Sequence, residues 1–145
     1  MKIEAELLFT MEIQKELKNG NTGRTKHWSS AHKEKQAWGR AVSQSDILTA
    51  TGVSLDFETF KTEVLLSRPI QQRVGMVVER VMGKRQRHWD PDSTLRGSKE
   101  LVDSIVFHGI IADDSHKHVA WCVGLQDDTI KDQGPFTRIY FYEAE

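Results

Sequence analysis

The spacing of apolar residues along the chain distinguishes segments expected to be strands from segments expected to be helices. In residues 3–15 the apolar side chains fall mainly on alternate positions, which is typical of a half-buried strand. After Ser98 an apolar stripe recurs at helical spacing, and Gly109 stands where a left-handed helix end is expected. The pattern predicts, in chain order, a strand at 3–15, a helix at 30–50, strands at 60–67 and 72–82, a helix from Ser98 to Gly109, and strands at 118–125 and 137–143.

The order of these elements predicts the fold class. Two short connections favour hairpins, the first joining 60–67 to 72–82 as an antiparallel pair. The second joins the last two strands into a closing antiparallel pair. We therefore expect a single domain over residues 1–145, of the α+β class, with a small mixed β-sheet and helices packed on one face.

Composition and location signals are those of an ordinary globular protein. Hydrophobic residues make up 38% and charged residues 28% of the 145 positions, and no stretch is apolar enough to span a bilayer. The N-terminus lacks the apolar core of a signal peptide. The single Cys122 cannot form an intrachain disulfide, which suits a reducing compartment, and it is expected to be a small buried side chain. A cytoplasmic location without membrane contact is the expectation.

Charge is distributed unevenly although the formal net charge is -1. Residues 18–40 hold six Lys or Arg and one acid, and residues 68–87 hold another six against one. From Glu100 to the end there are nine acids and three Lys or Arg. Two basic surfaces can face a polyanion, or they can be solvated faces that cancel.

A group of carboxylates follows the second basic segment. Asp90 and Asp92 lie two positions apart, so in extended backbone both side chains point to the same side. A helix and a glycine turn can bring Asp114 back toward them. Clustered carboxylates repel one another unless a cation lies among them, and Mg²⁺ prefers such oxygen ligands. A metal so held can activate water for phosphodiester hydrolysis.

Each feature also has a structural alternative. Asp90 and Asp92 can be a surface pair in which Asp92 caps a turn or helix, and Asp113 and Asp114 can belong to an ordinary polar loop. His116 and His118 have a spacing that could share zinc, but no Cys or third His lies at a matching distance.

The spacing around these acids resembles that of the RusA family of Holliday junction resolvases. The matching residues are Asp90-x-Asp92 after the basic run, then Lys99, Asp103 and the segment Gly109-Ile110-Ile111-x-Asp113-Asp114. The resemblance is specific over residues 72–123 and looser elsewhere. One departure is clear. The family has Asn after the second Asp and its Lys four positions after that Asp, whereas here Ser93 follows and Lys99 is seven positions away, which makes Arg96 an alternative source of positive charge.

This resemblance implies roles for particular residues. Asp90, Asp92 and Asp114 would bind Mg²⁺, with Mn²⁺ as a substitute, and together with Lys99 would form the catalytic set. Asp113 and Asp103 would orient these residues without binding the metal themselves. The residues expected to contact DNA are Lys84, Arg85, Arg87, Trp89, Arg24 and Lys26, although Trp89 could equally pack beneath the site.

The expected function is that of a magnesium-dependent endodeoxyribonuclease that resolves four-way junctions or other branched DNA by paired cuts. The resemblance further implies a homodimer, which would place two sites about one two-fold axis, and a role in recombination or repair of the kind carried by phages and prophages. Two alternatives stay open: a DNA-structure-binding module with weakened catalysis, and a nuclease acting on flaps or other branches.

Overall fold

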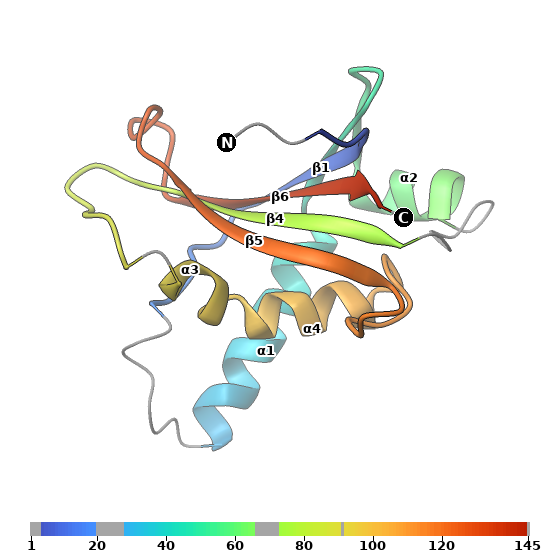
Figure 1. Ribbon diagram of the computed structural model, residues 1–145. Coiled ribbons are helices and arrows are strands. Elements are labelled where there is room, and N and C mark those ends of the chain that lie inside the picture. The colour runs from blue at the N-terminus through green and yellow to red at the C-terminus, as the bar shows by residue number, and fades with distance from the viewer. Residues whose placement is uncertain (1–3, 20–27, 66–72, 91, 145) are drawn as a thin grey trace.

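The computed structural model describes residues 4–19, 28–65, 73–90 and 92–144, apart from the side chains of 28–31 and 65. Its strands form one mixed six-stranded sheet in the order β3-β2-β1-β6-β4-β5 (Figure 1). Only the pair β4–β5 is parallel, and the other neighbours are antiparallel. The elements are β1 (Leu7–Ile13), α1 (Trp28–Ser43), β2 (Asp46–Thr49), β3 (Ser54–Asp56), α2 (Phe57–Phe60), a π-helical turn (Lys61–Leu65), β4 (Val74–Val81), α3 (Ser93–Arg96), α4 (Lys99–Phe107), β5 (Val119–Asp127) and β6 (Phe136–Glu143).

The hydrophobic core lies between the sheet and the helices. Alternate residues of the central strands point into it, and they meet apolar residues of α1, α2 and α4. In Figure 1, α1, α3 and α4 lie beneath the sheet. The fully buried contributors include Met11, Ile139, Met76 and Val78 from strands and Trp38, Phe60, Leu101 and Ile105 from helices. The α+β class with a mixed sheet and helices is therefore confirmed.

Several predicted elements are confirmed with shifted ends. The strands predicted at 3–15 and 72–82 are β1 and β4, and the helix after Ser98 is α4. Gly109 has a φ of 76°, the left-handed conformation expected at that helix end. The side chain of Ser98 does not cap the following helix; its hydroxyl donates to the carbonyl of Leu95 at 2.6 Å.

Over residues 60–65, the part that the structure describes, the strand predicted at 60–67 is wrong, because these residues are helical. The hairpin with 72–82 is wrong too, because the neighbours of β4 are β5 and β6. Phe57 and Phe60 lie three positions apart and are both buried, which is a helical spacing. Asp56 begins this helix, because its side chain accepts a hydrogen bond from the backbone N–H of Thr59 at 2.7 Å. The apolar run Val64, Leu65 and Leu66 outweighed these signals in the sequence-based assignment.

The helix predicted at 30–50 is correct at its start and wrong at its end. It ends at Ser43, and a hairpin of β2 and β3 follows. Gly52, predicted to stop the helix, instead lies in the turn of this hairpin with a φ of 88°. The short alternation of buried Ile47 with exposed Leu48 is the strand signal that was missed.

The last two strands exist as predicted, but they are not a closing antiparallel pair. β4 lies between them, antiparallel to β6 and parallel to β5. A parallel pair needs a crossover, which the segment containing α3 and α4 supplies between β4 and β5. In the described part of the chain, no helix is long and apolar enough to cross a membrane.

Candidate functional site

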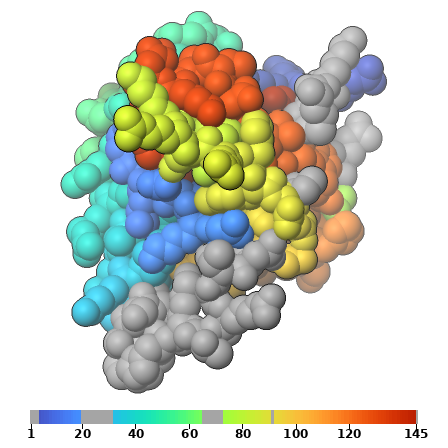
Figure 2. Space-filling view, turned by 90° about the vertical axis from the view of Figure 1, so that its left-hand side faces the viewer, coloured from blue at the N-terminus to red at the C-terminus, as the bar shows by residue number. Residues whose placement is uncertain are grey.

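A braced loop follows β4 and leads to Asp90. Figure 2 looks at this end of the molecule, where the loop lies between the β5–β6 connection and the segment after β1. Gln86 ties these pieces together: its side-chain amide donates to Glu16 at 2.6 Å, and its side-chain oxygen accepts from the N–H of Gly83 at 2.7 Å. Its backbone carbonyl accepts from Lys131 at 3.2 Å. The loop is thus fixed on both sides.

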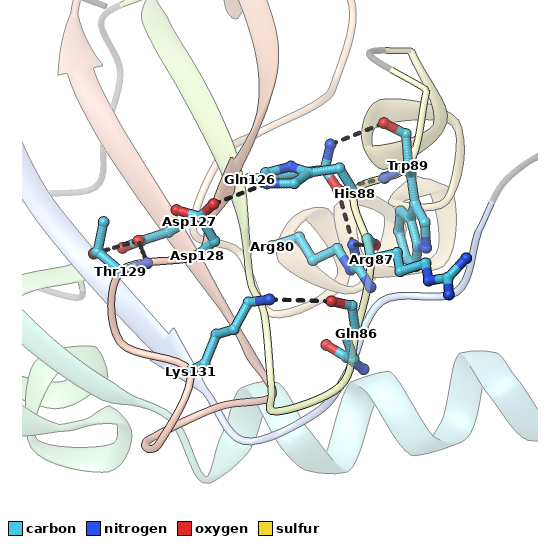
Figure 3. Close-up of polar contacts among 10 residues, drawn as sticks. All are labelled: Arg80, Gln86, Arg87, His88, Trp89, Gln126, Asp127, Asp128, Thr129 and Lys131. Atoms are coloured by element: carbon cyan, nitrogen blue, oxygen red, sulfur yellow. Dashed lines mark hydrogen bonds and ion pairs between the residues drawn. The ribbon is translucent and has the colours of Figure 1, made fainter.

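Gln126 fixes the end of this loop from β5 (Figure 3). Its side-chain oxygen accepts from the backbone N–H of Trp89 at 2.8 Å, and its amide donates to the Trp89 carbonyl at 3.1 Å. This two-bond clamp acts on the residue directly before Asp90. The backbone directly before Asp90 is therefore held by a β5 side chain that lies 36 positions after Asp90 in the sequence.

Arg80 supports the same clamp from beneath. It is only 3% exposed and lies on the helix side of β4. One guanidinium nitrogen donates to the Gln126 side chain at 2.8 Å and to the Arg87 carbonyl at 2.9 Å. Its guanidinium carbon lies 3.7 Å from the centre of the Trp89 ring, a cation–π distance. Burial lowers the pKa of Arg80, an effect opposed by the charge of Glu16.

The ring of Trp89 therefore packs inside the molecule. It is partly buried against the hydrophobic core as well as against Arg80. Of the two roles expected for it, packing beneath the site agrees with its position, and stacking on a base stays a prediction.

A second contact joins the loop to the β5–β6 connection. His88 Nε2 lies 3.0 Å from a carboxylate oxygen of Asp128, and both side chains are more than half exposed. The hydrogen bond from His88 is the main cause that lowers the pKa of Asp128. These contacts leave Lys84, Arg85 and Arg87 exposed along the loop. Arg85 has a φ of 67°, so the chain turns sharply among these cations.

Asp90 and Asp92 are exposed at the end of the loop. The Asp90 carbonyl accepts from the N–H of Ser93 at 2.9 Å, which starts the turn into α3. The Asp92 carboxylate forms an ion pair with Arg96, and its side chain makes no cap hydrogen bond. Asp92 thus stands at the N-cap position of α3 without capping it through its side chain, and Arg96 lies beside Asp92.

Two close contacts set the position of α3 and the start of α4. A Cβ at Gly124 of β5 would lie 3.1 Å from the backbone nitrogen of Leu95. A Cβ at Gly97 would lie 1.8 Å from the carbonyl oxygen of Lys18. Lys99 follows as the exposed first residue of α4, and Asp103 lies one turn later on the same side.

Asp114 lies at the opposite end of β5 from Asp90 and Asp92. It is exposed in the turn before the strand, where its N–H donates to the carboxylate of Asp113 at 2.8 Å. That hydrogen bond is the main cause that lowers the pKa of Asp113. From Val119 to Gly124 the strand extends roughly 17 Å at about 3.3 Å per residue. Among the described residues, no group of three or more His, Cys, Asp or Glu is placed to hold a metal.

The structure thus brings together part of the predicted site. Asp90, Asp92, Arg96 and the exposed cations of the loop lie in one region, whereas Asp113 and Asp114 lie apart from it. Arg24 and Lys26 fall outside the described residues. The sequence-based prediction of the site did not include Arg80, Gln126, Asp128 and Lys131. The available signal was an arginine within the valine-rich strand Val74–Val81.

Comparisons with known proteins give no family for this chain. No protein-family model matches it, and neither a curated protein nor a solved structure does.

Proposed function

We propose that this protein is a magnesium-dependent endodeoxyribonuclease that cuts four-way junctions or other branched DNA by paired phosphodiester hydrolysis. One observation carries the proposal: the loop held by Gln126 and Arg80 presents exposed Lys84, Arg85 and Arg87 directly before exposed Asp90 and Asp92. A pair of carboxylates beside a cluster of cations is suited to a metal ion and a phosphodiester at the same time.

The donor set fits magnesium. Mg²⁺ is often held by only one or two carboxylates, with waters and substrate phosphate oxygens as the other ligands. Asp90 and Asp92 would be those carboxylates. The ion would activate water and offset negative charge at the scissile phosphate. Arg96 forms an ion pair with Asp92, and in the proposal it would contact that phosphate once a cation binds the carboxylates.

The other assignments come from the resemblance to RusA-like resolvases. Asp114 would be the third ligand, and Lys99 would contact the scissile phosphate. Asp114 lies at the opposite end of β5 from Asp90 and Asp92. Its role therefore requires a test separate from that of Asp90. Asp103 and Asp113 remain supporting residues in the proposal.

The loop cations supply most of the affinity for DNA. Contacts from Lys and Arg to phosphates are independent of sequence and weaken as salt rises. A homodimer would place two such loops about one axis, which suits paired cuts in a junction.

The decisive experiment incubates the protein and a labelled four-way junction with Mg²⁺, beside the variant Asp90→Asn. We expect paired nicks near the branch point from the wild type and none from Asp90→Asn, with junction binding largely retained. Asp46→Asn, an exposed acid on β2, is the matched control and should cut normally. Cutting by Asp90→Asn at the wild-type rate would sink the metal assignment.

Two alternatives have distinct outcomes. Binding of the junction without cleavage in Mg²⁺ or Mn²⁺ would favour a DNA-structure-binding module. Faster cutting of a flap than of a junction would favour a flap nuclease. Light scattering checks the dimer, and a monomer at micromolar concentration would count against two coordinated sites.

A further inference from the structure

A groove between α1 and α4 lies away from the carboxylate pair. Its volume is about 560 Å³, within the range of small-ligand sites. The two helices cross beneath the sheet (Figure 1), and their contact is close because a Cβ at Gly39 would already lie 3.8 Å from the hydroxyl of Ser104. His108 forms a 3.0 Å hydrogen bond with the Gly39 carbonyl, which fixes the end of α4 against α1.

Phe107 stands out at the rim of this groove. Its side chain is 81% exposed, whereas Val53, the next most exposed large hydrophobic residue of the described chain, is 51% exposed. The ring lies nearly perpendicular to that of His108, with centroids 5.4 Å apart and planes at 83°. A ring so exposed is a flat platform rather than the floor of an enclosed pocket.

The charge of the groove is positive. Lys35 and Arg40 line it from α1, and no acid is among its lining residues. Within the described residues, neither side chain forms an ion pair. By contrast, a second groove of about 620 Å³ is lined by Glu4, Glu6 and Glu143, which would repel an anion.

We propose that the α1–α4 groove binds an unpaired nucleotide of a DNA strand, with the base stacked on Phe107 and the phosphate held by Lys35 and Arg40. Aromatic platforms flanked by cations are the common means of binding single strands without sequence preference. An acidic peptide would share the charge, but its apolar anchors need enclosed pockets of the kind that this open rim lacks.

The groove is within reach of a strand held at the proposed nuclease site. α4 begins at Lys99 and ends at Phe107, which places the two about 12 Å apart along the helix axis. A stacked strand advances about 3.4 Å per nucleotide, so roughly four nucleotides cover that distance. Only this identification of the ligand as an arm of branched DNA rests on the proposed function.

The test measures binding of a fluorescein-labelled oligothymidylate in EDTA by anisotropy, so that no cleavage is involved. Phe107→Leu keeps an apolar side chain but removes the ring face, and we expect its Kd to rise roughly 5- to 150-fold. Phe107→Tyr should bind like the wild type. Because Phe107 is exposed, neither change should affect folding, and circular dichroism checks this.

Charge is tested on the same helix. Lys35→Gln and Arg40→Gln should weaken binding and reduce its salt dependence, whereas Lys33→Gln, exposed on α1 but outside the groove, is the matched control. Equal Kd values for Phe107→Leu and the wild type would overturn the inference. So would displacement of the oligothymidylate by a tyrosine-containing polyglutamate peptide at lower concentration than by unlabelled oligothymidylate. If the wild-type protein cuts no junction but binds the oligothymidylate in a manner that depends on Phe107, this inference stands and only the proposed function is refuted.

Discussion

At the scale of single residues, Gln126 and Arg80 decide where the carboxylate pair lies. Gln126 alone satisfies the N–H and the carbonyl of Trp89 and accepts from Arg80. In the described chain, Nε of Arg80 is buried without a hydrogen-bond partner, and the two hydrogen bonds of this guanidinium both come from Nη1. Buried groups that lose a partner are costly, more so when charged.

We therefore expect Gln126→Ala to destabilise the protein. The change leaves the Trp89 N–H without its acceptor and removes one of the two acceptors of the Arg80 guanidinium, the other being the Arg87 carbonyl. We expect a loss of about 2–4 kcal/mol in the free energy of unfolding. Urea denaturation measures it. Gln133→Ala, an exposed glutamine of the β5–β6 connection, is the control and should change stability little. A Gln126→Ala protein as stable as the control would show that the clamp contributes nothing to folding.

A second residue-scale prediction concerns Tyr140 on β6. Its hydroxyl donates to Glu79 at 3.0 Å and accepts from Arg138 at 3.2 Å. Burial raises the pKa of Tyr140 to about 12; the nearby charge of Glu79 adds to this, and Arg138 opposes it. Because the folded state favours the neutral phenol, this contribution to stability is fully present below about pH 10, the ordinary tyrosine pKa. It is lost as the pH rises through about 12.

The measurement is an absorbance titration of tyrosine, made simple because the chain has only two tyrosines. The transition near pH 12 should be absent in Tyr140→Phe, and the stability advantage of the wild type over this variant should shrink above pH 10. A transition near 12 that persists in Tyr140→Phe would assign it to Tyr142 instead.

At the scale of elements, close backbone contacts hold α3 and α4 against the rest of the fold. Gly97 has a φ of -76°, which any residue adopts, so its need for glycine comes from space and not from conformation. A Cβ there would lie 1.8 Å from the Lys18 carbonyl oxygen, with backbone on both sides.

Gly97→Ala is expected to shift the junction of α3 and α4 and to cost about 1–3 kcal/mol, the usual range for overpacking. Gly39→Ala is the opposite case, because its nearest new contact is at 3.8 Å and it lies inside α1. There the substitution should stabilise by roughly 0.5–1 kcal/mol through helix propensity. Thermal unfolding of the two variants measures the loss of stability in one and the gain in the other. A Gly97→Ala protein as stable as the wild type would show that the junction of α3 and α4 can move freely.

Elements with a strong periodic pattern could be predicted from the sequence, and pairings between distant elements could not. β1 and α4 carry apolar patterns of one period, β4 carries a valine-rich apolar run, and their positions follow from those patterns. The strand predicted at 60–67 was assigned wrongly because the helical spacing of Phe57 and Phe60 is only one turn long. Its meaning becomes clear in the fold, where Phe60 packs against Phe9 and Phe57 against His108. That β5 pairs with β4 rather than β6 depends on the α3–α4 crossover, which no local pattern reveals.

The same division applies to the candidate site. Asp90, Asp92 and the loop cations lie within nine positions of one another, so their proximity is a local property that the sequence carries. Gln126 and Lys131 reach this region through the sheet, and only the fold brings them there. The expected approach of Asp114 relied on α4 returning the chain toward Asp92, whereas α4 carries it to the start of β5.

At the scale of the whole molecule, a formal net charge of -1 conceals surfaces of opposite sign. The cations of the loop after β4 lie at one end, and the acid-lined groove of Glu4, Glu6 and Glu143 lies elsewhere. A polyanion would therefore be oriented on approach, although the protein as a whole is nearly neutral. Binding of DNA should then depend on a few local cations rather than on the total charge.

The salt dependence of junction binding tests this view. Each phosphate contact contributes about 0.9 to the slope of log K against log salt, so changing Lys84, Arg85 and Arg87 together to Gln should reduce the slope by roughly 2.7. The measurement uses EDTA, so that binding is separated from cutting. A triple variant at Lys33, Lys61 and Lys117 removes the same charge from exposed or partly exposed positions outside the loop and should leave most of the slope. Equal losses in the two variants would mean that DNA responds to net charge alone, and the loop would then not be the surface that receives it.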